Sequence, residues 1–212
     1  MSDSVVKIRN AVRYVRSSPA RFKKFKTCME DEKISCKSMV CLDVHTRWNS
    51  TYVMLEAAEK FEKAFDRLED HDSQYVKGPP SKEDWDNARN LVKFLGVFYE
   101  VTLRISGSLF VTSNQYFHEL CLIKNVITEK DPLLSRMAKG MERKFNKYWG
   151  DFEKINSLLF VAIVLDPRYK LKFTKYCLSH FYEKEIVDEM VRFVDQTLRR
   201  LYDEYRLSSL GF

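Results

Sequence analysis

The chain has 212 residues, of which 45% are hydrophobic and 14% aromatic, so it has enough apolar surface for a buried core and is not a disordered protein. Its six glycines and five prolines leave few tight turns, which disfavours a multi-stranded sandwich or barrel. No apolar run approaches the roughly 18 residues of a membrane span, and the first ten residues lack the apolar region of a signal peptide. We therefore expect a soluble, intracellular protein rich in helices.

The net charge of +6 comes from the N-terminal segment. Residues 1–27 contain a single acidic side chain, Asp3. Their basic side chains are Lys7, Arg9, Arg13, Arg16, Arg21, Lys23, Lys24 and Lys26. Arg9, Arg13 and Arg16 recur at helical spacing, and a basic helix edge of this kind can follow the phosphates of a nucleic acid. The same pattern also fits an ordinary solvated helix face.

Apolar residues recur every three or four positions along most of the chain, which is typical of amphipathic helices. In chain order, this spacing and the proline and glycine breaks predict helices over residues 4–17, 20–31, 50–70, 81–105, 112–128, 132–149, 155–165, 168–180 and 183–207. Residues 38–44 are the best strand candidate. The predicted fold is all-α, an irregular bundle of about eight or nine helices with room for one short strand near residues 38–44.

Two of these helices begin with capping signals. Ser81 lies three residues before Asp84, which is close to the spacing of a capping box. Asp166 precedes Pro167, and aspartate as N-cap with proline at the first helical position is an ordinary helix start.

Candidate metal sites are incomplete in this sequence. His118 and Cys121 share one helix face, as do Cys177 and His180, so together they could form a Cys₂His₂ zinc site. Both pairs fall in amphipathic helices, where cysteine is a common core residue, and we expect no zinc. Asp43 and Asp166 could together form a carboxylate pair for Mg²⁺, but turn formation explains both residues more simply. No phosphate-binding loop or nucleophile motif occurs, so we predict no cofactor and no catalytic residue.

The unusual segment is Asp43-Val-His-Thr-Arg47-Trp48-Asn-Ser-Thr-Tyr52. Arg47 and Trp48 stand at the entrance of a predicted helix beside hydroxyl and amide side chains. A cation next to a stacking plane can grip a phosphate and stack an unpaired base. The alternative is that Trp48 is a core aromatic residue, with Ser50 or Thr51 as the helix N-cap.

At this segment the sequence resembles a known family. LDVHTRWNSTYVMLEAAEKF is similar to the DVxTRWNSTYxMLxxA signature of plant hAT-superfamily transposases, the Activator-like group and its domesticated sleeper-type relatives. Downstream, FVAIVLDPRYKLKF resembles the family's LDPRxK block, and VTSNQYFHELCLI resembles the region between the two. The resemblance covers essentially the whole chain, with the motifs in the family's order.

The resemblance implies a place in a larger protein. Family members combine a BED zinc finger, an RNase H-like core with an Asp-Asp-Glu metal triad, a helical insertion domain and a dimerisation region. It implies that residues 1–48 form the edge of the RNase H-like core and that residues 49–212 form the helical insertion. The triad and the family's Cys-x-x-His motif are then expected outside residues 1–212. The enzyme would be the parent protein, a nuclear, metal-dependent transposase.

The resemblance also implies a role for Arg47 and Trp48. In related transposases this pair lies near the active site, and the tryptophan is implicated in stacking on a displaced base of the transposon end. We therefore predict a non-catalytic, DNA-binding fragment with contact residues Arg47, Trp48, Arg9, Arg13, Arg16, Lys23 and Lys24. The alternative function is a protein–protein interaction module without direct DNA contact. His45, where relatives commonly have proline, departs from the pattern and bears on how Trp48 is presented.

Overall fold

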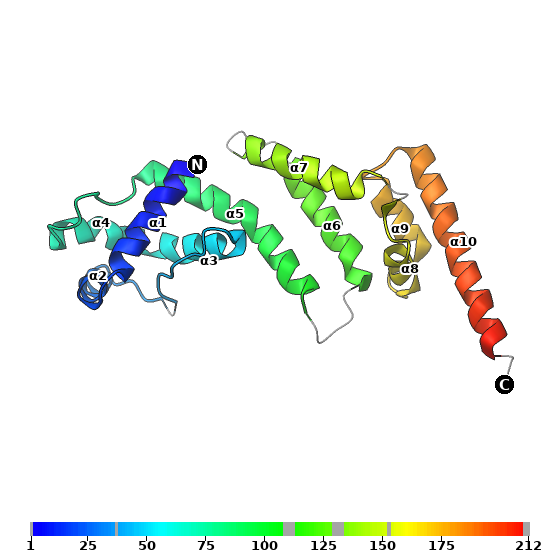
Figure 1. The fold of residues 1–212 in the computed structure, drawn as a ribbon, viewed down its shortest axis with the longest axis horizontal. Helices are drawn as coiled ribbons and strands as arrows, with labels where there is room; N and C mark the ends of the chain where they lie inside the picture. Colours follow the sequence, from blue (N-terminus) through cyan, green and yellow to red (C-terminus); the bar gives the residue numbers. More distant parts are fainter. Residues whose placement is uncertain (1, 37, 108–112, 129–133, 152–153, 210–212) are drawn as a thin grey trace. The chain divides into compact units, whose positions relative to one another are not determined.

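The computed structural model describes residues 2–36, 38–107, 113–128, 134–151 and 154–209, and within these ranges it is all-helical. Two compact units follow one another in the chain, Met1–Tyr99 and Glu100–Phe212 (Figure 1). The predicted all-α class is confirmed. The assignment of residues 1–48 and 49–212 to functional domains stays a prediction.

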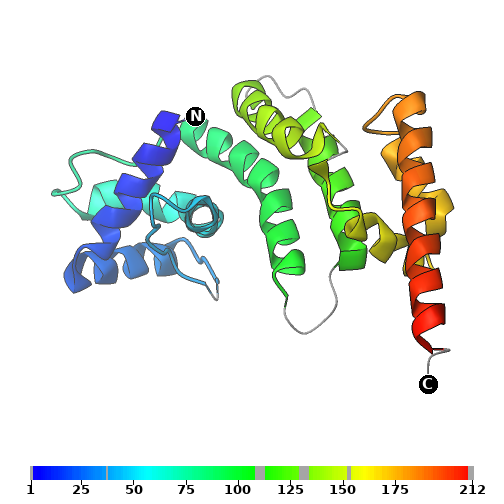
Figure 2. The ribbon, with the colours of Figure 1, turned by 45° about the vertical axis from the view of Figure 1, so that its right-hand side comes forward.

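The described part of the first unit contains two α-helices before the Arg-Trp pair, and three α-helices and one 3₁₀ helix from Trp48 onward. Their bounds are α1 (Ser2–Arg16), α2 (Pro19–Asp31), α3 (Trp48–Ala58), the short 3₁₀ helix η1 (Glu59–Phe61), α4 (Glu62–His71) and the beginning of α5 (Lys82–Ile105). Figures 1 and 2 show α1 lying across the unit, in contact with both α2 and α3, while α2 packs on α4. Ser18 caps α2 and Pro19 occupies its first turn, as expected of a helix start.

The apolar faces of these helices meet in one aromatic core. The ring of Phe25 from α2 lies 6.0 Å from that of Phe61 and 4.7 Å from that of Phe65, centroid to centroid. Trp85 of α5 packs on Phe65 at 5.8 Å and is 1% exposed. The capping box predicted for α5 is present, because the Ser81 N–H donates to the Asp84 carboxylate and Ser81 Oγ accepts from the Asp84 N–H. The core therefore fixes α2, α4 and α5 to one another.

Residues 38–44 correct one expectation. They form no strand, and no strand occurs anywhere in the ranges the structure describes. A strand needs a partner for its backbone hydrogen bonds, and this unit supplies only helices. The apolar character of the segment has a different origin, since Val40 is 2% exposed and packs as a single core residue while Leu42 is exposed.

The helix predicted over residues 50–70 is divided. α3 ends at Ala58, η1 takes up the next three residues and α4 begins at Glu62. Phe61 ends η1 and Phe65 lies in α4, and both rings pack on Phe25. Apolar spacing alone does not distinguish a continuous helix from one interrupted by a 3₁₀ turn.

In the residues that the structure describes, the second unit is built from the end of α5 and five further α-helices. Their bounds are α6 (Ser113–Thr128), α7 (Ser135–Trp149), α8 (Leu158–Leu165), α9 (Lys170–Leu178) and α10 (Lys184–Ser209). α6 packs on α7 and α8, and α10 packs on α8 and α9. The predicted helix starts at Thr112 and Pro132 lie outside the described residues. No described helix is both long and apolar enough to cross a membrane.

An ion pair between the exposed Arg104 and the buried Glu119 joins the end of α5 to α6 within the second unit. The guanidinium of Arg104 donates to both carboxylate oxygens of Glu119, at 2.7 and 2.8 Å, and Glu119 is 4% exposed. The apolar core lies beyond this pair, where Phe117 packs edge-on against Phe160 at 5.4 Å. The carboxylate on the otherwise apolar face of α6 is thus explained by its arginine partner.

Candidate functional site

The Arg-Trp segment is a turn that leads directly into α3. The Arg47 N–H donates to the carbonyl of Val44 at 2.8 Å, which closes the turn. The Arg47 carbonyl then accepts the N–H groups of Ser50 and Thr51, at 3.0 and 3.2 Å, and so begins the helix. Arg47 is therefore the N-cap residue, and its side chain makes no capping hydrogen bond.

Asp43 anchors the start of the turn to α1 and α3. Its carboxylate accepts from Arg9 Nε at 2.9 and 2.8 Å and from Thr51 Oγ1 at 2.9 Å. Asp43 and Arg9 are buried, with side chains 1% and 8% exposed. Burial alone would raise the pKa of Asp43, but the hydrogen bonds from Arg9 and Thr51 outweigh burial and hold that pKa below its ordinary value. Asp43 is therefore an ionised carboxylate already occupied by protein donors.

Ser50 holds the same turn from the other side. Its hydroxyl accepts the Val44 N–H at 2.7 Å. Ser50 and Thr51 thus form hydrogen bonds with residues that precede the helix. The sequence had suggested one of them as the N-cap of α3, but the N-cap is Arg47. Hydrogen bonds from the first turn of α3 thus hold the turn at Asp43 and at Val44. These bonds restrict the orientation of the side chains between Val44 and Ser50.

Arg47 and Trp48 lie on the exposed side of this turn. Trp48 is 44% exposed, and its ring packs edge-on against Phe98, at 6.5 Å and 85°. Arg47 is exposed, and no ion pair to it is seen among the described residues. Next to them, Asn49 Oδ1 is buried and has no hydrogen-bond partner within the described ranges. A free guanidinium and an accessible indole therefore stand side by side at the start of α3.

The three arginines of α1 are not equivalent. Arg9 is 6% exposed and is committed to Asp43. Arg13 and Arg16 are exposed. Their positive charges act on two residues of the segment that leads to the turn, Asp43 and Cys41. Arg13 contributes to the lowered pKa of Asp43, while burial raises the pKa of the Cys41 thiol and the charge of Arg16 opposes that rise.

The two predicted lysines of α2 differ in the same way. Lys23 is exposed, and its ammonium makes no ion pair in the described parts of the chain. Lys24 pairs with the buried carboxylate of Asp72 at 2.9 Å, although its own side chain remains 48% exposed. The structure thus brings Arg9, Arg13 and Arg16 beside the Arg-Trp turn, while Lys24 is tied to the end of α4.

Asp166 belongs to a local turn in the second unit. Its carboxylate accepts from the Arg168 guanidinium at 2.7 Å, from the Arg168 N–H at 3.0 Å and from the Asn114 amide at 2.8 Å. These bonds, those of Arg168 first, hold the pKa of Asp166 well below its ordinary value. Asp166 is the C-cap of α8, whereas the sequence indicated the N-cap of the next helix, which begins at Lys170. The stretch after Pro167 continues as a turn before that helix starts.

The candidate zinc ligands are only partly brought together. The hydrogen bond to Cys177 and burial raise the pKa of the Cys121 thiol, so these two cysteines are neighbours in the second core. His118 and His180 are exposed, and His180 Nδ1 lies 2.9 Å from the Tyr176 carbonyl. Within the described ranges, no three His, Cys, Asp or Glu residues are grouped to hold a metal ion.

The sequence did not reveal a second feature of the first unit. The segment before α5 reads as a polar loop ending in Gly78-Pro79-Pro80, yet Asp72 and Tyr75 in it are buried. Asp72 accepts from the Tyr14 hydroxyl at 2.8 Å as well as from Lys24. Together with α1 the segment encloses a cavity of about 780 Å³. In the sequence, only the aromatic Tyr75 within this polar segment indicated that part of it is buried.

Two family models match this chain. Residues 1–94 match the ZBED1 RNase-like helical domain, and residues 114–205 match the hAT-like transposase, RNase-H fold. The first match falls within the first compact unit and the second within the second unit. No solved structure matches the chain.

Curated plant proteins match over nearly the same residues. The Zinc finger BED domain-containing protein RICESLEEPER 2 of Oryza sativa subsp. japonica is 35% identical over 205 residues, which are 95% of this chain and 28% of that protein. The Putative AC transposase of Zea mays is 33% identical, over 97% of this chain and 26% of its own length. DAYSLEEPER of Arabidopsis thaliana is 30% identical, over 86% and 26%. The chain spans less than a third of each of these relatives, and by these matches it belongs to the plant hAT-type transposase family.

Proposed function

We propose that this chain is a non-catalytic part of an hAT-type transposase, or of a domesticated derivative, and that it contacts transposon-end DNA through Arg47 and Trp48. The observation that carries the proposal is the contrast within the turn. Asp43, Ser50 and Thr51 are occupied by hydrogen bonds, whereas the adjacent Arg47 and Trp48 are exposed. A rigid turn with a free cation and an aromatic plane is suited to a nucleic-acid end.

Each side chain supplies a different kind of contact. The Trp48 indole can stack on an unpaired base, and such stacking is worth about 1–3 kcal/mol per base. The Arg47 guanidinium can donate charge-assisted hydrogen bonds to the adjacent phosphate. Stacking favours a displaced base over a paired one because a paired base is already stacked in the duplex.

Basic side chains on α1 and α2 would add sequence-independent affinity. Arg13, Arg16 and Lys23 are exposed, and Lys24 keeps part of its side chain in solvent. Contacts of this kind fix register on the phosphate backbone and weaken as salt rises. We assign Arg9 a positioning role, because its guanidinium holds Asp43 and so the turn that carries Arg47.

Catalysis, oligomerisation and nuclear location are proposed for the whole protein. The relatives include one named as a transposase, and this chain spans about a quarter of it. The metal-dependent cleavage would then be carried by the rest of the protein, and homo-oligomer formation would also depend on the parent protein.

Fluorescence anisotropy tests the proposed contact. The chain is titrated with a flush duplex and with the same duplex carrying an unpaired terminal base, at several salt concentrations. We expect tighter binding to the unpaired end and loss of that preference in Trp48→Ala. Tyr148→Ala, which removes a 63% exposed aromatic of α7, is the matched control and should keep the preference. Weak binding that ignores Trp48 and disappears at modest salt would contradict the proposal.

A protein-interaction module remains a second candidate function because of one feature of α10. Tyr202 and Tyr205 are 67% and 78% exposed, and they line a hollow of about 730 Å³ with the 68% exposed Leu165. Exposed apolar surface of this kind often marks a protein contact. Sedimentation velocity over a concentration series tests for self-association, which Tyr205→Ser should abolish if this face is the contact.

A further inference from the structure

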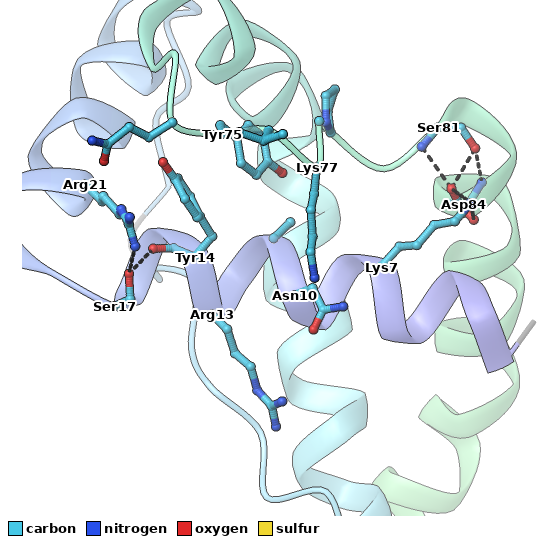
Figure 3. Close-up of a pocket in the computed structure, with 15 residues that line it drawn as sticks. Lys7, Asn10, Arg13, Tyr14, Ser17, Arg21, Tyr75, Lys77, Ser81 and Asp84 are labelled. Atoms are coloured by element: carbon cyan, nitrogen blue, oxygen red, sulfur yellow. Dashed lines mark hydrogen bonds and ion pairs between the residues drawn. The ribbon is translucent and has the colours of Figure 1, made fainter.

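A cavity of about 780 Å³ opens in the first unit beside α1. Figure 3 shows its construction, with α1 along one side, the segment before α5 along the other, Arg21 of α2 at one end and Ser81 with Asp84 at the opposite end. Its volume is in the range of small-molecule sites. Neither Arg47 nor Trp48 lines it, so it is separate from the Arg-Trp turn.

The floor of the cavity is aromatic and contains an unsatisfied hydroxyl. Tyr14 and Tyr75 lie side by side, with ring centroids 4.8 Å apart, and the Arg21 guanidinium lies 4.2 Å over the Tyr14 ring. Tyr75 is 5% exposed, and its hydroxyl has no hydrogen-bond partner among the residues that the structure describes. A buried hydroxyl without a partner is costly, and a polar ligand group reaching it would remove that cost.

The charges around the cavity leave an excess of positive charge. Lys7 is paired with Asp84 at 2.9 Å, and Asp84 also accepts from the Ser81 hydroxyl at 2.7 Å. Arg13 and Lys77 have no acidic partner in the described part of the chain, and both are exposed. In Figure 3, Lys77 extends across from the loop toward Asn10 of α1. The cavity thus offers the free ammonium group of Lys77 next to an aromatic and apolar wall.

We propose that this cavity binds a nucleoside phosphate. Lys77 holds the phosphate, because a free ammonium group forms charge-assisted hydrogen bonds with phosphate oxygens. The nucleoside lies against the apolar wall that Val76 and Pro79 provide and reaches the hydroxyl of Tyr75. Inorganic phosphate alone would meet the ammonium group and leave this wall unused. The ligand is either a free mononucleotide or the 5′-phosphorylated end of a strand.

Isothermal titration calorimetry on the full chain distinguishes these sources. The probes are inorganic phosphate, the four deoxynucleoside 5′-monophosphates, and a trinucleotide with and without a 5′-phosphate. We expect a mononucleotide or the phosphorylated trinucleotide to bind at least tenfold more tightly than inorganic phosphate. A mononucleotide that binds as well as the trinucleotide identifies a free ligand, and preference for the phosphorylated trinucleotide identifies a strand end.

Two matched pairs of variants place the binding in this cavity. Lys77→Ala should weaken binding roughly tenfold, which corresponds to one charge-assisted hydrogen bond. Lys93→Ala removes an equally exposed lysine of α5 outside the cavity and should change nothing. Val76 is 89% exposed, so both of its variants should fold. Val76→Glu should weaken binding more than Val76→Gln does, because both variants replace part of the apolar wall and only the first adds charge repulsion.

The proposal does not depend on the DNA-end contact. Trp48→Ala should leave nucleotide binding unchanged, so failure of one proposal is seen separately from failure of the other. Absence of binding by every probe at millimolar concentration would overturn the nucleoside phosphate site. So would equal binding of inorganic phosphate, or nucleotide binding that Lys77→Ala and Lys93→Ala weaken alike.

Discussion

Asp43 in the first unit and Asp166 in the second both follow a leucine in a motif, and both accept hydrogen bonds from an arginine. The arginine of Asp43 comes from α1, 34 residues away in sequence, and the pair is buried. The arginine of Asp166 is two residues away and is 62% exposed. The first carboxylate therefore fixes a turn against a distant helix, and the second mainly shapes its own turn.

This difference in burial determines how firmly each of the two turns is held. A buried, long-range pair is costly to break because the remaining charge is left without a partner. An exposed, local pair is screened by solvent. The turn at Asp43 is thus the more firmly held of the two, and it is the one that presents Arg47 and Trp48.

The largest effect is expected from breaking the Asp43 pair. Asp43→Asn leaves the Arg9 guanidinium buried without its charge partner and should lower the free energy of unfolding by about 3–5 kcal/mol. Urea denaturation followed by circular dichroism measures this. Asp31→Asn removes the more exposed partner of Arg67 and should cost at most about 1 kcal/mol. Equal losses in the two variants would contradict the assigned role of Asp43.

The same pair predicts a pH dependence. Because the pKa of Asp43 is lower when folded, its stabilisation is present above its ordinary value of 3.8 and is lost as pH falls through the folded value. The gap in unfolding free energy between wild type and Asp43→Asn should therefore be constant near neutral pH and shrink below about pH 4. Urea midpoints measured across that range test this, and a gap that widened in acid would refute it.

A smaller loss is expected at Asp166. Asp166→Asn keeps one acceptor oxygen for Arg168 and Asn114, and the exposed guanidinium of Arg168 can be solvated. The urea midpoint should shift less than in Asp43→Asn under identical conditions. A shift as large as that of Asp43→Asn would contradict the claim that the buried pair stabilises its turn more than the exposed pair does.

The smallest effect on stability is expected at Trp48. Its indole is 44% exposed and meets Phe98 only edge-on, so Trp48→Ala should cost no more than about 1 kcal/mol. Thermal unfolding monitored by circular dichroism measures this. A loss comparable to that of core tryptophan removal, about 3–5 kcal/mol, would identify Trp48 as a core residue and favour the alternative interpretation.

The sequence predicted the helices well because apolar spacing records which face is buried. α1, α2 and α10 begin and end within two residues of the predicted bounds. The break at η1 was not predictable, since Phe61 and Phe65 keep helical spacing whether or not the helix tightens. The strand expected at residues 38–44 was wrong, because local apolar character does not reveal whether a second strand exists to pair with it.

The candidate site could be predicted less completely than the fold. The Arg-Trp turn was found from its residues, but Arg9 looked like its neighbours Arg13 and Arg16. Only the three-dimensional pairing with Asp43 separates a buried structural arginine from exposed ones. The cavity was missed because Tyr75 and Lys77 meet α1 only in the folded chain.

The central claim is that Trp48 stacks on an unpaired base at a DNA end. It is tested most directly by a cycle that combines Trp48→Ala with removal of that base as an abasic site, using equilibrium anisotropy at one fixed salt concentration. The account predicts that base removal weakens wild-type binding by about 1–3 kcal/mol, roughly 5- to 150-fold, and leaves Trp48→Ala unaffected. An equal loss in both proteins would contradict it.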